Sequence, residues 1–294
     1  MITDGIARHV NSNATRPVFA KSFDRALFEN GILPSDGRTF GAARMRDVTI
    51  EDMEFNNDPN SGHPHALSLV DCEKVIIRNC RFVGTGSWAT GSNYGICLDY
   101  CQTVLIENVQ VIGGSIGVCL SGCESVEVNG VLSDNCEYIA DLAHCGGRHI
   151  TAKNLTATGK GGTLLIGVPE WDGDETTFVS VEKYSGPSVS ITSNCVGVRI
   201  SDSKISGWSH VRTFTGYSCR DVSFEACDGA KVKASKFKKP SDLTQVDWVP
   251  AARELRVFGS NTRLEVQNGK SVVNGHPFKG RVVLDGRTQV VTES

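Results

Sequence analysis

The sequence predicts an all-β solenoid, in which short parallel strands coil and each turn buries its apolar face only against its neighbours. Four segments between residues 66 and 159 copy one another. Each contains an alternating strand, a turn that ends in cysteine and a second alternating strand. Cys101, Cys123 and Cys145 follow one another in equal steps of 22 residues. Apolar residues recur with a period of two, which predicts strands and excludes a helical repeat.

The copies continue on both sides of these segments and give about eight rungs over residues 40–230. Cys72 anchors the first of the four. The equivalent anchor positions outside them are held by Met45, Thr176, Cys195 and Cys219. The alternation predicts that the first strand of each rung turns the following residues inward: Leu67, Leu69, Ile96, Leu98, Val118, Leu120, Ala140 and Leu142.

This repeat resembles the right-handed parallel β-helix of the pectate-lyase-like kind, over about two thirds of the chain. Members of that family include lyases, hydrolases, epimerases and non-catalytic viral spikes. The resemblance therefore implies the fold more specifically than the function. In architecture the chain is closest to bacteriophage tailspike proteins.

The segments outside the repeat are predicted to close its two ends. Residues 1–39 form an N-terminal cap or an attachment segment, with a short amphipathic helix expected over 17–30 because apolar residues there have helical spacing and a glycine follows. Residues 231–250 are rich in lysine and predict a solvated linker, with a basic patch for an anionic partner as the alternative. Residues 251–294 predict a small antiparallel module of two hairpins, at 263–273 and 281–291, which caps the coil, joins subunits, or both.

Composition narrows the classes of function. The formal net charge of −3 and the low aromatic content give no nucleic-acid signal, and no apolar run is long enough for a membrane span. The first residues do not resemble a secretory signal. The 11 cysteines are odd in number, placed periodically and free of CxxC pairs. We therefore expect buried free thiols, stacked at one inner corner by Cys101, Cys123 and Cys145, and synthesis in a reducing cytoplasm.

Two insertions, 57–65 and 84–95, interrupt the same corner in consecutive rungs, and a third, 168–175, interrupts the opposite corner. Loops on a rigid scaffold commonly carry binding sites. Their aromatic, imidazole and amide side chains suit a sugar, whose C–H face stacks on rings. The candidate substrate-binding residues are Trp88, Asn93, Tyr94, His63, His65 and Trp171.

Two acidic residues are the candidates for catalysis. Asp99 and Asp141 lie on the predicted outward stripe, two rungs apart and two residues offset. An acid–base pair of carboxyls that leans together to about 6.5–9.5 Å suits an inverting glycosidase. The plain alternative is that both carboxylates only solubilise an exposed strand. Asp172 and Asp174 are weak candidates for Ca²⁺, and no other cofactor is expected.

The interpretation is a tailspike-like virion surface protein that binds, and in one version cleaves, bacterial cell-surface polysaccharide. A stand-alone polysaccharide lyase or hydrolase is the alternative from another class, and a non-catalytic decoration or baseplate spike is the third. A homotrimer is expected, because outward apolar positions such as Val70, Cys97 and Cys119 suit a partner better than water. Other virion proteins are expected to contact the N-terminal segment.

Overall fold

The structure is a computed structural model. It describes residues 6–8, 19–21, 25–33, 40–43, 47–57, 65–84, 94–144, 146–167, 175–192, 194–214, 219–237, 254–257, 263–267, 270–273, 276–277, 281–284 and 289–293. Side chains are described from Asp47 to Val232, with gaps. The described residues contain no helix, and hence none long and apolar enough to cross a membrane.

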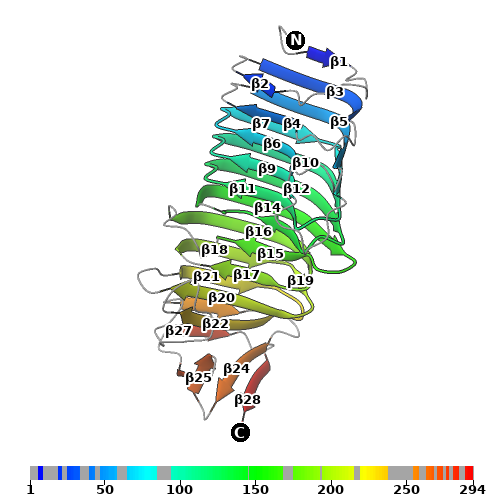
Figure 1. Ribbon diagram of the computed structural model, residues 1–294. Coiled ribbons are helices and arrows are strands. Elements are labelled where there is room, and N and C mark those ends of the chain that lie inside the picture. Colours follow the sequence, from blue (N-terminus) through cyan, green and yellow to red (C-terminus); the bar gives the residue numbers. More distant parts are fainter. Residues whose placement is uncertain are drawn as a thin grey trace.

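Almost all strands belong to two long sheets (Figure 1). Sheet A contains β1 (Ile6–Arg8), β3 (Arg25–Leu33), β5 (Asp47–Asn57), β7 (Lys74–Arg78), β10 (Thr103–Ile112), β12 (Ser125–Asp134), β14 (Gly147–Thr158), β16 (Thr176–Gly186), β18 (Cys195–Ser201), β21 (Cys219–Glu225), β23 (Glu254–Val257) and β27 (Arg281–Leu284), with β8 (Arg81–Gly84) and β19 (Lys204–Ile205) beside them. Sheet B contains β2 (Phe19–Lys21), β4 (Phe40–Ala43), β6 (His65–Val70), β9 (Tyr94–Asp99), β11 (Ile116–Ser121), β13 (Tyr138–Asp141), β15 (Thr163–Ile166), β17 (Val189–Thr192), β20 (Trp208–Phe214), β22 (Lys231–Phe237), β24 (Arg263–Gln267), β25 (Lys270–Val273), β26 (His276–Pro277) and β28 (Gln289–Glu293).

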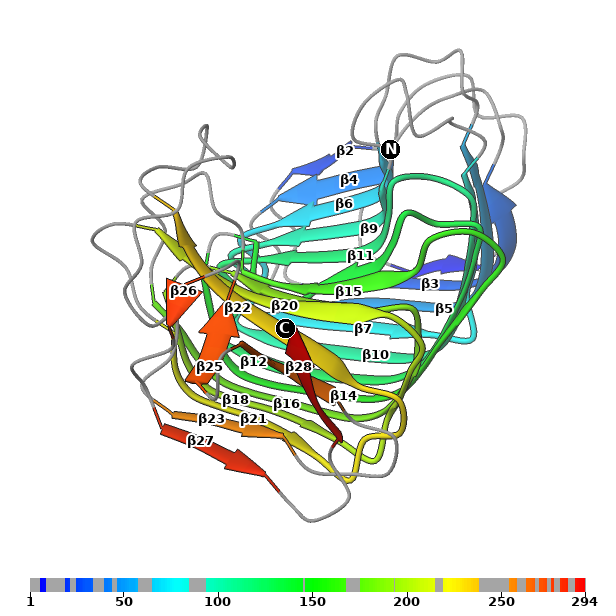
Figure 2. The same cartoon turned by 90° about the horizontal axis from the view of Figure 1, so that it is seen from below.

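The chain passes from one sheet to the other at each turn, and neighbouring turns pair in parallel. For example, β10 pairs with β7 and β12 in sheet A, while β11 pairs with β9 and β13 in sheet B. Seen from its end, the molecule is a coil with the two sheets facing each other across a common interior (Figure 2). This all-β arrangement of parallel strands fits a parallel β-helix.

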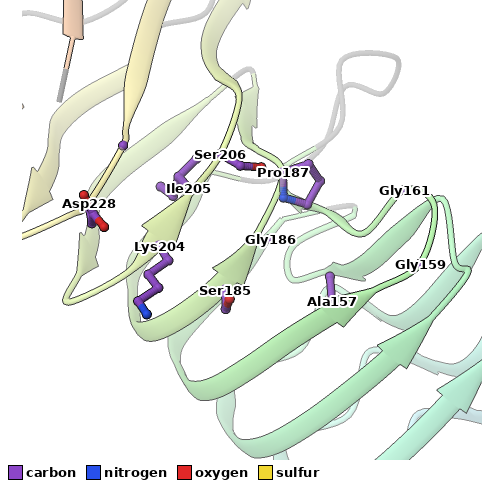
Figure 3. A pocket seen from close by; sticks show the side chains of 11 residues that line it. Ala157, Gly159, Gly161, Ser185, Gly186, Pro187, Lys204, Ile205, Ser206 and Asp228 are labelled. Carbon is purple, nitrogen blue, oxygen red and sulfur yellow. The ribbon is translucent and has the colours of Figure 1, made fainter. Parts of the chain in front are cut away.

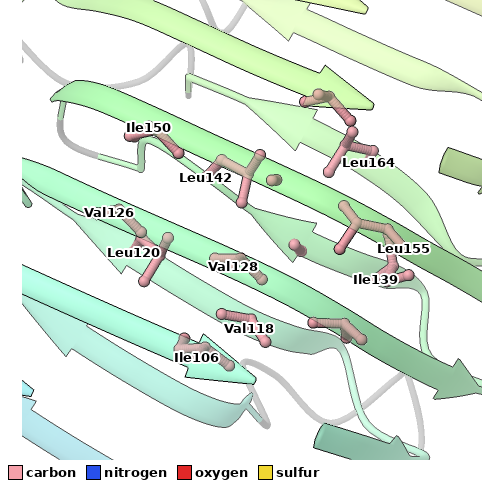
Figure 4. Close-up of a cluster of buried hydrophobic side chains, with 14 of the residues drawn as sticks. Ile106, Val118, Leu120, Val126, Val128, Ile139, Leu142, Ile150, Leu155 and Leu164 are labelled. Carbon is pink, nitrogen blue, oxygen red and sulfur yellow. The ribbon is translucent and has the colours of Figure 1, made fainter. Parts of the chain in front are cut away.

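The interior is filled by the residues that alternation predicts. All eight side chains named above as inward-pointing are fully buried, and they belong to one continuous core. In register, Val118 pairs with Ile96 on one side and Ala140 on the other, so like positions stack from rung to rung. Figure 4 shows this stacking, with Val118 and Leu120 facing Val126 and Val128 across the core. Burial of each such side chain stabilises the fold by about 1.5–3 kcal/mol.

Successive rungs of sheet A, from β5 to β21, bend at one shared position where the backbone is left-handed. The eight residues that share this position have positive φ angles and lie in register: Asp52, Asn79, Asn108, Gly130, Asn154, Lys183, Asp202 and Ala226. Asn and Gly tolerate this conformation better than other residues. Neighbouring amides also bond, with Asn108 Nδ2 donating to Asn79 Oδ1 at 3.5 Å. The bend lets one strand cover two sides of the core.

The nine described cysteines are free and buried, as expected from their periodicity. Cys72, Cys101 and Cys123 occupy equivalent positions of successive rungs. The hydrogen bond with Cys123, together with burial, raises the pKa of Cys101 to about 12. The Cys101 thiol is therefore neutral, and the three buried side chains form a column of small apolar groups.

The predicted place of Cys145 in this stack is wrong. Gly147 pairs with Cys123, and Thr176 then pairs with Gly147. The step between these rungs is longer than predicted because the turn contains two more residues, one of them Gly146, whose φ of 92° suits glycine alone. Cys145 itself lies outside the described residues. The later anchors are confirmed, since Cys195 pairs with both Thr176 and Cys219.

The helix predicted over 17–30 is also wrong. Residues 25–33 form strand β3, which pairs in parallel with β5. Ala26 is in register with Val48, and Phe28 with Ile50. The same segment alternates with a period of two, and pairing with the first rung satisfies its backbone as a strand. Tertiary pairing overrides the helical spacing.

The C-terminal segment is only partly the antiparallel module that was predicted. The hairpin at 263–273 is confirmed, because β24 and β25 pair in antiparallel fashion. The hairpin at 281–291 is wrong, because β27 pairs in parallel with β23 and β28 with β24. The sequence pattern of two alternating strands does not distinguish a hairpin from one more rung of the coil, in which the two strands belong to different sheets. Here the strands form a further rung. The predicted linker is likewise partly strand, since β22 covers Lys231–Phe237, and 238–250 lies outside the described residues.

Candidate functional site

The outer face of sheet B carries two columns of chemically useful side chains. One column, in register across neighbouring strands, is His65, Tyr94, Ile116, Tyr138 and Thr163. The second is Ser68, Cys97, Cys119, Asp141, Leu165, Ser190 and His210. In the second column, Cys97, Cys119 and Asp141 lie between inward positions and therefore point away from the core. Tyr94, Ile116 and Tyr138 of the first column do not follow this alternation, but they pack with the two thiols in a cluster separate from the core.

The first column is aromatic at its described N-terminal end. The rings of His65 and Tyr94 stack with centroids 4.6 Å apart and an interplanar angle of 19°. Tyr138 lies two rungs further along the same column. Tyr94 and Tyr138 pack against a small apolar cluster that is separate from the core. Two of the predicted substrate-binding residues, His65 and Tyr94, are thus brought together on one face.

The two candidate catalytic carboxylates have the predicted offset but different surroundings. Asp141 is level with Cys97, so Asp99 lies two rungs and two residues away. Asp99 is partly exposed, and its carboxylate oxygens lie 3.7 and 3.9 Å from the Cys97 thiol, which donates to them. Asp141 is fully buried. Solvent and substrate therefore reach Asp99 more readily than Asp141.

The buried carboxylate of Asp141 is held by the turn that follows it. Its Oδ2 lies 2.9 Å from His144 Nδ1, and its Oδ1 accepts from the Ala143 amide at 3.4 Å. The turn is fixed in place because the amide of His144 donates to the carbonyl of Leu120 on the neighbouring strand. The turn therefore brings the imidazole of His144 back to the carboxylate of Asp141 on the outer face of the sheet.

Two buried thiols complete this cluster. Cys97 and Cys119 are adjacent in register and are 5% and 1% exposed. The hydrogen bond with Cys97, then burial and the negative charge of Asp141, raise the pKa of Cys119 well above its ordinary value. A thiol sulfur, a carboxylate oxygen and an imidazole nitrogen of Cys119, Asp141 and His144 lie within 4.8 Å of one another.

Sequence reasoning did not find this cluster. Alternation placed Cys97, Cys119 and Asp141 on the outward stripe, which is one part of the signal. The other part is the spacing of Asp141 and His144, three residues apart across a tight turn. The sequence does not predict the path of that turn, which brings His144 beside Asp141.

The remaining sequence-predicted residues lie outside the described part of the chain: Trp88, Asn93, His63, Trp171, Asp172 and Asp174. The connections that carry them follow the predicted corners. Residues 58–64 and 85–93 both link sheet A to sheet B, immediately before β6 and β9. Residues 168–174 link β15 to β16 at the opposite corner.

Two hollows lie elsewhere on the described surface. One, of about 430 Å³, lies at the corner after β14 and β16, and its wall is largely glycine and proline with Lys204 and Asp228 at one end (Figure 3). The other, of about 550 Å³, lies on the outer face of sheet A and includes Arg78 and Lys153. Those two cations are paired, Arg78 with Glu51 and Glu107 and Lys153 with Glu182. Neither hollow is lined by tyrosine, whereas the face of sheet B carries Tyr94 and Tyr138; the second hollow includes His149 and Glu127.

Comparison with known proteins gave no match: no protein-family model, no curated protein and no solved structure is detectably similar to this chain.

Proposed function

We propose that the protein is a tailspike-like virion surface protein, a right-handed parallel β-helix that binds a bacterial cell-surface polysaccharide along the outer face of sheet B. The observation that carries the proposal is the column in which the stacked rings of His65 and Tyr94 are followed, two rungs on, by Tyr138. The partly exposed carboxylate of Asp99 lies at the other end of β9, roughly 16 Å from Tyr94 along the strand.

This combination has the chemistry that sugar recognition requires. The C–H face of a pyranose packs on aromatic rings, and its hydroxyls donate to carboxylates. Tyr94 and Tyr138 are two strand spacings apart, roughly 9–10 Å, so they are placed for successive parts of an extended glycan rather than for one ring. The insertion that contains Trp88 enters β9 directly before Tyr94, so it adjoins this column in the chain.

Cleavage of the bound glycan by Asp99 and Asp141 is the second candidate activity, as a tailspike depolymerase or as a stand-alone hydrolase or lyase. The two-rung offset favours it. The complete burial of Asp141 weighs against direct contact with substrate. Binding is therefore the primary proposal. A non-catalytic decoration or baseplate spike remains the alternative if no glycan binds.

A homotrimer attached to the particle through residues 1–39 belongs to the same proposal. One argument for it is weaker than expected, because Cys97 and Cys119 are already buried within a single chain. A large apolar side chain does reach the surface at Tyr100, which is 59% exposed. Such side chains, repeated around a symmetric assembly, suit subunit contacts.

The test is binding to a panel of bacterial polysaccharides by the wild-type protein and two aromatic variants. Tyr94→Ala removes a ring from the proposed face, and we expect it to weaken binding at least about tenfold, equal to about 1.4 kcal/mol. Phe178→Ala is the matched control, since Phe178 lies in β16 of sheet A and stacks on His149 instead. Equal affinity of Tyr94→Ala and wild type, or binding to no glycan, would contradict the proposal.

A further inference from the structure

We propose that Cys119, Asp141 and His144, completed by Cys97, form a site for a transition-metal ion on the outer face of sheet B, with Zn²⁺ the best match. The site does not depend on glycan binding. It is distinct from the weak Ca²⁺ candidates Asp172 and Asp174. Its role is to join β9, β11 and β13 with the turn that follows β13.

Three of the ligands already lie close together. The sulfur of Cys119, a carboxylate oxygen of Asp141 and a ring nitrogen of His144 are within 4.8 Å of one another. Zinc bonds of about 2.0–2.3 Å in a tetrahedron place ligand atoms roughly 3.3–3.8 Å apart. Rotation of the side chains about their own bonds is enough to close the difference. The backbone is fixed in place by strand pairing on both sides of Cys119.

Cys97 supplies the fourth ligand. It is in register with Cys119, which is itself in register with Asp141, so three ligands come from one column on three neighbouring strands. The Cys97 side chain hydrogen-bonds to that of Cys119 and is 5% exposed. Three of the four ligands are buried, and His144 is 26% exposed. A full set of four protein ligands is typical of structural rather than catalytic zinc sites.

The electrostatics of the cluster favour a cation. Asp141 is fully buried, and in the part of the chain that the structure describes its one basic partner is His144. A buried carboxylate beside two buried thiols is costly unless positive charge compensates it. A divalent ion would compensate the carboxylate and the thiolates together.

The donor set also selects the class of ion. Thiolate and imidazole ligands suit Zn²⁺ and related transition metals, whereas Ca²⁺ and Mg²⁺ require oxygen ligands. The same three residue types could be arranged as a Cys–His–Asp nucleophile system. The Cys119 sulfur, however, belongs to a side chain that is only 1% exposed, so a substrate does not reach it.

Cobalt substitution tests the site directly. The full chain, reduced and freed of metal by a chelator, is titrated with Co²⁺ and then with Zn²⁺. We expect one equivalent of Co²⁺ to produce the intense visible bands of a tetrahedral ion and a near-ultraviolet thiolate-to-cobalt charge-transfer band. One equivalent of Zn²⁺ should abolish both, and metal analysis of the Zn²⁺-loaded protein should give one ion per chain.

Variants separate this site from adventitious thiol binding. Cys119→Ser should reduce the charge-transfer band by about half, because it removes one of the two thiolate ligands. His144→Gln, a change at a partly exposed side chain, should weaken binding without unfolding the protein. Cys136→Ala, which removes a buried thiol in the turn between β12 and β13, at the opposite end of β13 from Asp141, is the matched control and should bind as wild type. No tetrahedral spectrum, or a spectrum unchanged in both Cys119→Ser and His144→Gln, would overturn the proposal. Loss of metal by these variants with unchanged glycan binding would separate the two proposals.

Discussion

The Nδ1 atom of His144 lies 2.9 Å from Oδ2 of Asp141, and that carboxylate has no exposure to solvent although it lies on the outer face of its sheet. Outward residues of a solenoid normally contact water or a partner. Here an outward carboxylate is held as a core residue would be.

Asp99 and Asp141 should respond differently to the same isosteric change. Asp99→Asn keeps the shape of a partly exposed side chain, so the melting temperature should change little. Asp141→Asn places an amide where a buried carboxylate meets an imidazole, and should destabilise the fold by about 1–3 kcal/mol. If the protein cleaves a glycan with this pair, both variants should also lose cleavage. Equal melting temperatures of the two variants would contradict the buried pairing.

The bend in sheet A should be sensitive to side chains at one glycine. Gly130 has a φ of 80°, and a Cβ there would lie 2.9 Å from Oδ1 of Asn108. Gly130→Ala should therefore cost about 1–2 kcal/mol of unfolding free energy, measured by urea denaturation. Asn154→Gly is the matched control at the equivalent position of the next rung and should change stability less. A neutral Gly130→Ala would contradict the register of the bend.

The buried thiols should be protonated and unreactive toward thiol reagents in the folded protein. Burial raises the pKa of Cys136 to about 12 and that of Cys227 to about 11, from the usual 9.0. The described thiols should react with a thiol reagent only after unfolding, and denatured, unreduced protein should titrate all 11 cysteines. Because the unfolded thiols ionise first, the contribution of these thiols to stability should be constant below about pH 9 and fall above it. Mostly oxidised cysteines would contradict the structure.

The molar mass of the protein in solution tests the proposed homotrimer. Light scattering should give three times the mass of one chain for the intact protein. Deletion of residues 251–294 should yield monomers or aggregates, because it removes the last parallel strands together with the β24–β25 hairpin. The mass of a single chain would refute the trimer. A trimeric deletion variant would assign the contacts to the rest of the coil.

The repeat could be predicted from sequence because its signals are local. Alternation and the recurring anchors place Leu98 and Leu120 in the core without knowledge of any distant contact. The shift from Cys145 to Gly147 could not be predicted, since a left-handed glycine turn absorbs two residues without disturbing the apolar pattern. Segment 25–33 satisfies both helical and strand periodicity, and only its pairing with β5 decides between them.

The candidate site was predictable only as far as strand geometry extends. Alternation places Cys97 and Asp99 on the outer face, and the anchors bring His65 beside Tyr94. Tyr94 itself has the spacing of an inward residue, and only the structure shows that it packs with Cys97 outside the core. The position of His144 depends on a turn whose path is set by a hydrogen bond to Leu120 on another rung. No spacing rule within one rung contains that information.

The most direct test of glycan recognition is a crystal structure of the protein with a bound oligosaccharide. The oligosaccharide is taken from the bacterial polysaccharide that binds the protein. The account predicts sugar rings against His65, Tyr94 and Tyr138, with a hydroxyl within hydrogen-bond distance of Asp99. Sugar bound instead in the corner hollow beside Lys204 and Asp228, with the face of sheet B bare, would contradict it.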